Sequence, residues 1–169
     1  MRKKYIIITI IAMLVNYFAD QLTKYFAVQY LKGDEPLYLF KKTIMIYYAE
    51  NSGAFLSLGS NWPDFVKYIV LLILPVLVCL YGIYYCFMKE KSITKVIFLS
   101  TIIGGGLSNL IDRIINDFTV VDFLNFGIGS LRTGILNVAD LSVTFGAILF
   151  IIIEYRQNRK TKKLPIINE

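Results

Sequence analysis

Histidine is absent from the 169 residues, and cysteine occurs only as Cys79 and Cys86. The missing histidine excludes Ser-His and Cys-His nucleophile pairs and zinc sites built on histidine ligands. On a helix the two cysteines are roughly 10 Å apart along the axis, too far for a disulfide. We interpret both as ordinary buried or lipid-facing residues. Any hydrolytic chemistry is therefore expected to use carboxyl groups.

Charge is also scarce, because only 18% of residues are charged while 56% are hydrophobic and the mean hydropathy is +0.59. A soluble domain usually carries about 25% charged residues, so this balance predicts a membrane protein. The length fits a single membrane domain, 1–169. The net charge of +6 does not indicate nucleic acid as a partner, because most basic residues lie in short runs at the edges of apolar stretches.

Four apolar runs are long enough to cross a bilayer, at about 5–28, 67–88, 96–115 and 135–155. The first begins like a signal peptide but continues without a small-x-small cleavage site, so we expect an uncleaved span. Pro75 lies inside the second run, where we expect it to kink the helix. The predicted fold class is therefore an all-α integral membrane protein with four transmembrane helices.

The basic residues determine the orientation. Eleven of the eighteen lie on one side of the four spans, in the two tails and one turn: Arg2, Lys3, Lys4, Lys89, Lys91, Lys95, Arg156, Arg159, Lys160, Lys162 and Lys163. This side is predicted to be cytoplasmic, with both termini inside and segments 29–66 and 116–134 outside. Within the first outward segment, the β-prone runs 37–40 and 44–48 predict a small β-type structure at the membrane surface.

With this orientation, the polar residues of the spans fall in one layer near the outer surface. They come from the first, third and fourth spans and from the segment after the third: Asp20, Lys24, Asn109, Asp112, Arg113, Asp122, Asn137 and Asp140. Charges at membrane depth are costly and usually face a protein interior or a wet cavity. This convergence predicts a carboxylate site at the outer surface, without a metal.

Structural roles are open for the same residues. Asn137 with Asp140 fits a helix cap, and residues 119–122 fit another helix start. Asp112 and Lys24 fit buried ion pairs, so Lys24→Gln is expected mainly to lower yield. The run 104–106 is glycine throughout, which fits close packing of helices.

Two carboxyl groups brought together do not both ionise easily, so one holds a proton. The ionised member can take a proton from water while the protonated member polarises a peptide carbonyl. The residues alone do not determine which pair of aspartates meets. A transport or channel component with the acids as an ion path remains possible, although a path should place polar residues at several depths. A scaffold whose carboxylates only cap helices is a further alternative.

Five motifs then follow in order: Asp20-Gln-Leu-Thr-Lys24, Asn51-Ser-Gly-Ala-Phe55, Gly104-Gly-Gly-Leu-Ser-Asn-Leu-Ile-Asp-Arg113, Val120-Val-Asp-Phe123 and Asn137-Val-Ala-Asp140. Together they resemble the lipoprotein signal peptidase (signal peptidase II) family over nearly the whole chain. The resemblance implies cleavage of lipidated prolipoproteins just before the diacylglyceryl-modified cysteine, at the outer face of the bacterial cytoplasmic membrane. It also implies a surface cradle, contact with membrane lipid, a monomer and no cofactor.

By motif, the resemblance makes Asp122 and Asp140 the catalytic pair. It assigns six residues to lining or shaping the substrate site: Asp20, Asn51, Gly53, Asn109, Arg113 and Asn137. Two positions depart from the family pattern. Ser108 stands where the family usually has glycine, and Phe55-Leu56 replaces a small residue followed by an aromatic. Asp117, a nearby extra acid, is interpreted as solvated.

Overall fold

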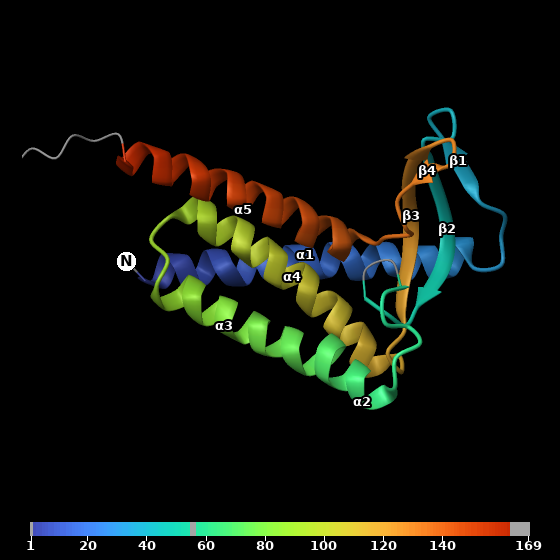
Figure 1. Cartoon of the computed structure of the whole chain (residues 1–169), viewed down its shortest axis with the longest axis horizontal. Coiled ribbons are helices and arrows are strands. Elements are labelled where there is room, and N and C mark those ends of the chain that lie inside the picture. The colour runs from blue at the N-terminus through green and yellow to red at the C-terminus, as the bar shows by residue number, and fades with distance from the viewer. Residues whose placement is uncertain (1, 55–56, 163–169) are drawn as a thin grey trace, which may run out of the picture.

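The computed structural model describes residues 2–54 and 57–162, of which 160–162 are described by their backbone alone. The chain is mostly helical with a small sheet at one end (Figure 1). The elements in order are α1 (Arg2–Leu31), β1 (Leu37–Leu39), β2 (Ile44–Asn51), α2 (Asp64–Lys67), the π-helix η2 (Tyr68–Ile73), α3 (Leu74–Met88), α4 (Ile93–Ile115), β3 (Val120–Ile128), β4 (Leu131–Arg132) and α5 (Val138–Lys162).

Four helical stretches of the described chain are long and apolar enough to cross a membrane: Arg2–Leu31, Asp64–Met88, Ile93–Ile115 and Val138–Arg159. The prediction of four long apolar helices is thus confirmed. The predicted start of the fourth, at 135, is three residues too early. Leu136 pairs with Leu124 of β3, and Asn137 caps the helix, so the helix begins only at Val138.

The second span contains a π-helical segment just before Pro75, and the kink expected at this proline stays a prediction. It consists of α2, η2 and α3 in direct succession, and Pro75 occupies the first turn of α3. Proline has no backbone N–H and its ring collides with the preceding turn of an α-helix. A π-helical segment widens that turn, and such segments are usually found as local irregularities inside α-helices. The helix therefore passes through the proline without ending.

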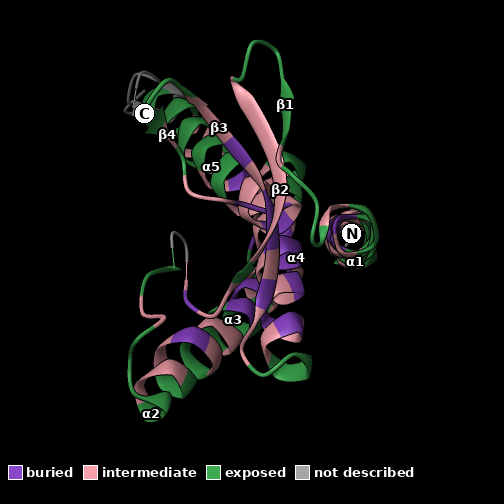
Figure 2. Ribbon diagram, turned by 90° about the vertical axis from the view of Figure 1, so that its right-hand side faces the viewer, coloured by how far each residue is buried: buried purple, intermediate pink, exposed green. Residues whose placement is uncertain are grey.

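Helix α4 lies at the centre of the bundle and packs against α1, α3 and α5 (Figures 1 and 2). Its three consecutive glycines each face a different neighbour. A methyl group on Gly104 would lie 2.8 Å from the Met13 carbonyl oxygen of α1, and one on Gly105 would lie 2.6 Å from the Ala139 carbonyl oxygen of α5. One on Gly106 would lie 3.4 Å from a sulfur of α3. The predicted close-packing role is confirmed for the first two.

A four-stranded antiparallel sheet, in the order β1-β2-β3-β4, crosses the ends of the helices (Figure 1). Strands β1 and β2 form the first hairpin, which confirms the β-structure predicted from the runs 37–40 and 44–48. The helix start expected at residues 119–122 is wrong, because Val120 begins strand β3. β-branched residues favour strands, and Val120 pairs with Asn51 of β2. The second outward segment therefore supplies half of the sheet.

Candidate active site

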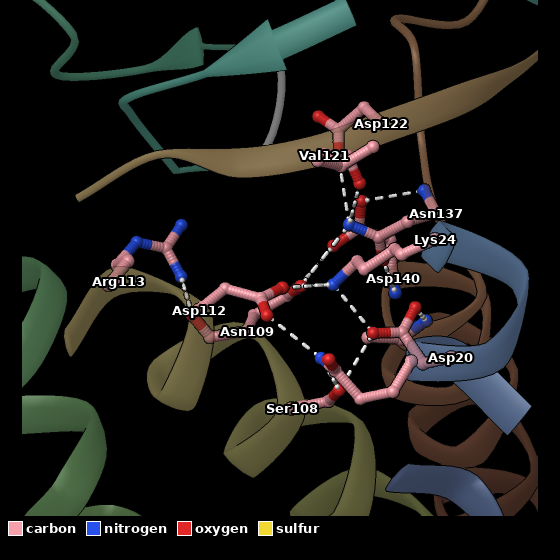
Figure 3. A network of polar contacts seen from close by, with 12 residues as sticks. Asp20, Lys24, Ser108, Asn109, Asp112, Arg113, Val121, Asp122, Asn137 and Asp140 are labelled. Carbon is pink, nitrogen blue, oxygen red and sulfur yellow. Dashed lines mark hydrogen bonds and ion pairs between the residues drawn. The ribbon is translucent and has the colours of Figure 1, made fainter. Parts of the chain in front are cut away.

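Asp122 and Asp140 lie close together where the sheet meets the helix bundle. Asp122 is on β3 and 2% exposed, and Asp140 is in the first turn of α5. Asn137 joins them: its side-chain nitrogen donates to Asp122 Oδ1 at 2.6 Å, and its backbone N–H donates to Asp140 Oδ2 at 3.2 Å. Figure 3 shows both carboxyl groups pointing toward Asn137. The structure thus brings together two of the four candidate aspartates as a pair.

Asp140 and Asn137 also form a reciprocal cap at the start of α5. The Asp140 N–H donates to Asn137 Oδ1 at 2.9 Å, while Asp140 accepts the Asn137 N–H in return. This arrangement satisfies two free donors of the helix terminus. The capping role and the pairing role considered from the sequence are therefore both present in one residue. Since the helix end carries partial positive charge, it stabilises an ionised Asp140.

Asp122 sits in a drier environment on the strand. Burial raises the pKa of Asp122 to about 6, and the nearby negative charge of Asp140 acts in the same direction. Two amide donors oppose this shift by favouring the carboxylate: Asn137, and Asn51 at 3.0 Å from Oδ2. A buried carboxyl group of raised pKa beside another acid is the usual arrangement of a proton-transfer site.

Asp20 and Asp112 are paired elsewhere, with Lys24. The Lys24 ammonium lies 2.5 Å from Asp20 and 2.6 Å from Asp112, and both carboxylates are buried. Asp20 also accepts from Ser108 Oγ at 2.7 Å and from the Ala139 N–H at 2.8 Å. All these partners are protein groups, so Asp20 contributes to the shape of the site by joining α1, α4 and α5. Ser108, the departure from the family pattern, is thereby part of the network.

Arg113 links the end of α4 to the loop after β2. Its guanidinium donates to the Gly53 carbonyl at 2.6 Å and to the Asn109 carbonyl at 3.1 Å. The loop is tight, because a Cβ at Gly53 would lie 2.7 Å from backbone atoms of Ser57 and Leu58. Only glycine fits this approach. Asn51 and Arg113 thus hold this loop beside Asp122. The departure at Phe55-Leu56 lies outside the described residues.

A cavity of about 360 Å³ opens beside Asp122 between β2, β3 and the segment that leads to α5. It is lined by Tyr47, Ala49, Glu50, Asn51, Ser57, Asp122, Asn125, Thr133, Gly134 and Ile135. Sequence reasoning found only the two motif residues of this set, Asn51 and Asp122. The others carry no local signal, because only the packing of β2, the loop after it, β3 and the segment after β4 brings them together. Asp117, by contrast, is exposed, as its interpretation as a solvated acid requires.

Within the part of the chain that the structure describes, no group of three or more His, Cys, Asp or Glu side chains is arranged to hold a metal ion. The polar groups converge instead on the two carboxylates and their amide partners. Such a site can hold a water molecule and a proton between two acids, and the adjacent cavity can admit a peptide.

The sequence of this chain is similar to those of known proteins. The family model described as signal peptidase (SPase) II matches residues 10–156. A lipoprotein signal peptidase of Borrelia hermsii is 34% identical over 160 residues, covering 90% of this chain and 93% of that protein. One of Borreliella afzelii is 37% identical over 148 residues, covering 85% and 86%.

The fold is shared with a solved bacterial membrane enzyme. The TM-score is 0.79 at 24% identity, over 94% of this chain and 93% of that one. A second bacterial membrane enzyme gives a TM-score of 0.73 at 25% identity, over 86% and 90%. Since the family model spans most of the sequence and relatives above 30% identity align over most of their length, the chain belongs to the signal peptidase II family.

Proposed function

We propose that this chain is an aspartic endopeptidase that cuts diacylglyceryl-modified prolipoproteins just before the lipidated cysteine, using Asp122 and Asp140. As a member of the signal peptidase II family, it is a peptidase that removes signal peptides from prolipoproteins. The transport alternative has no support in these comparisons. The observation that carries the aspartic assignment is the pair of carboxyl groups, buried Asp122 and half-buried Asp140, that Asn137 bridges beside the cavity.

The environments of the two acids give them different roles. Each acid accepts two hydrogen bonds from amide groups, but only Asp140 also lies at the positive end of a helix, α5. It is therefore the ionised member and takes a proton from water. Asp122, on the strand, holds the shared proton and donates it toward the peptide carbonyl oxygen as the tetrahedral intermediate forms. When the C–N bond breaks, the proton removed from water passes from Asp140 to the leaving amine, and a hydroxyl of the intermediate returns a proton to Asp122.

The substrate site follows from the same geometry. Asn51, Gly53 and Arg113 keep the loop after β2 close to Asp122, and this loop with the sheet forms the cradle for the peptide. Asp20, Asn109 and Asn137 shape the site from beneath, through bonds to other protein groups. A peptide in extended form could lie in the cavity with its scissile bond over the two carboxyl groups.

The placement in the membrane is also proposed. The N-terminus, the turn between α3 and α4, and the end of α5 lie together at the end of the bundle opposite the sheet (Figure 1). This end carries the basic clusters, so the positive-inside rule places both termini in the cytoplasm and the sheet at the outer face. We expect a monomer whose partners are lipidated prolipoproteins and membrane lipid.

The test is cleavage of a lipidated precursor by the purified protein. Asp122→Asn and Asp140→Asn should each lower the rate by about 10³-fold or more, because each removes a group needed for proton transfer. Both proteins should accumulate normally, because asparagine has nearly the same shape as aspartate and, at position 140, also suits a helix start. Asp117→Asn, which changes an exposed acid five residues before Asp122 in the chain, is the matched control and should retain full activity. EDTA should leave the rate unchanged. Wild-type rates in either dyad variant would refute the aspartic assignment.

A further inference from the structure

Lys24 lies in a helix long enough to span the membrane and is the one lysine that is buried among the described residues, at 4% exposed. Its ammonium group has three N–H donors, and each has a partner. Two are the carboxylates of Asp20 and Asp112, at 2.5 and 2.6 Å. The third is neutral: Asn109 Oδ1, at 2.8 Å. The two ion pairs explain why the charge is buried, but they leave the third contact to be explained.

The third contact fixes the direction of the Asn109 amide. An asparagine side chain presents an acceptor oxygen on one side and a donor NH₂ on the other, and a half-turn exchanges them. Here the oxygen accepts from Lys24 and also from Asn137 Nδ2 at 3.2 Å, so the NH₂ faces Asp140 and donates to Oδ1 at 2.9 Å. Reversed, the NH₂ would meet an ammonium and the oxygen would meet a carboxylate. Both contacts would be repulsive.

The network therefore connects a charge on α1 to an acid on α5 through one amide of α4. Figure 3 shows the Lys24 ammonium between Asp20 on one side and Asn109 and Asp112 of α4 on the other. We propose that Lys24 is a positioning residue for the catalytic pair, which acts by holding the Asn109 amide with its donor toward Asp140. This inference rests on the proposed function. It replaces the expectation that Lys24 only supports the fold.

The first experiment separates catalysis from folding. Lys24→Met removes the ammonium, so kcat in the folded fraction should fall by about 10- to 100-fold, the usual scale for losing an oriented supporting hydrogen bond. KM should stay within about twofold, because Lys24 does not line the cavity. Lys95→Met, which removes a lysine of α4 paired with Glu154 at the end of the bundle opposite the sheet, should change neither constant.

A double-mutant cycle with Asn109→Ala distinguishes a positioning role of Lys24 from a purely structural one. Asn109→Ala alone should lower kcat by a similar factor, and adding Lys24→Met should lower it no further. If Lys24→Met does not accumulate, Lys24→Met/Asp112→Asn removes one charge of each sign. This should restore stability but not kcat.

Three results would overturn the proposal. They are wild-type kcat in Lys24→Met or Asn109→Ala, losses that multiply in the double variant, and recovery of kcat together with stability in Lys24→Met/Asp112→Asn. Asp122→Asn is measured alongside. If it were fully active, the proposed function itself would fail, whatever the Lys24 variants do.

Discussion

The half of the bundle next to the sheet, called the outer half after the proposed orientation, differs from the opposite, inner half in how its helices are joined. In the outer half, α1, α4 and α5 meet through buried polar side chains that bond one another, such as Asp20, Ser108 and Asn137. In the inner half, the buried contacts between α3 and α4 are apolar or weakly polar, such as Cys86 with Val96, and Cys86 with Ser100 across 3.9 Å. The junction of α1, α4 and α5 near the sheet is thus held by directional hydrogen bonds, whereas the buried contact between α3 and α4 is held mainly by shape.

This difference follows from the membrane. Large apolar side chains stand exposed along the spans, for example Phe18 at 62% and Leu77 at 58%. Lipid solvates them as well as a protein core would, so apolar burial drives helix association only weakly there. Helix association there depends mainly on close packing at glycine and on hydrogen bonds between helices. The site occupies the half where hydrogen bonds dominate, because catalysis needs side chains held in fixed directions.

The largest effect is expected where close packing supports the site. In Gly105→Ala, the new methyl group meets the Ala139 carbonyl, a backbone atom that cannot give way, and we expect a loss of about 2 kcal/mol or more. Activity should fall as well, since Ala139 precedes Asp140 in the chain. Gly106→Ala is the matched control: its methyl group has ordinary contact, and alanine favours the helix by up to about 1 kcal/mol. Thermal unfolding in detergent measures both, and equal effects would contradict the packing account.

A second, smaller effect compares two serines on the same helix. Ser108 and Ser100 are both fully buried on α4. Ser108 Oγ donates to Asp20 at 2.7 Å and accepts from Gln21 at 3.0 Å, so Ser108→Ala should destabilise by about 1–2 kcal/mol. Ser100→Ala, which loses only a weak contact with Cys86, should stay within about 0.5 kcal/mol. Equal losses would mean that the two halves are fastened alike.

The smallest effect is a displacement of the pH profile. Asn51 donates to Asp122 Oδ2 and favours its ionised form, so Asn51→Ala should raise the pKa of Asp122 further above about 6. The limb of the kcat profile that reports Asp122 should therefore move to higher pH. Glu50→Gln, which changes an exposed acid of the same cavity, should move it less, since exposed charges are screened. A limb that moves to lower pH in Asn51→Ala would contradict the assignment.

The direction in which Asp122 changes the free energy of unfolding with pH can be tested in the same samples. The folded state raises the pKa of Asp122 from its ordinary 3.8 to about 6, so it binds this proton more strongly than the unfolded chain does. The contribution of Asp122 to stability is therefore fully present below pH 3.8 and is lost as pH rises through about 6. Asp122→Asn should remove this part of the pH dependence of unfolding.

Much of the site was accessible from the sequence, because depth in a membrane is a property of each segment by itself. Hydropathy marks the four spans, and a rise of about 1.5 Å per residue then places Asp20, Asn109 and Asp140 in one layer. The motif order added the family and the choice of Asp122 with Asp140. The first hairpin also followed from its local β-propensity.

What the tertiary structure alone decided depends on contacts between distant segments. The Val120 strand looked like a helix start until its pairing with Asn51 was known. The cavity-lining Asn125 and Thr133 follow from strand register. Lys24 looked like a partner of acids only, until packing brought Asn109 to its third donor. Hydropathy and the position in the sequence determine how far along a helix a residue lies. Only tertiary packing determines which way its side chain points and which residues it contacts.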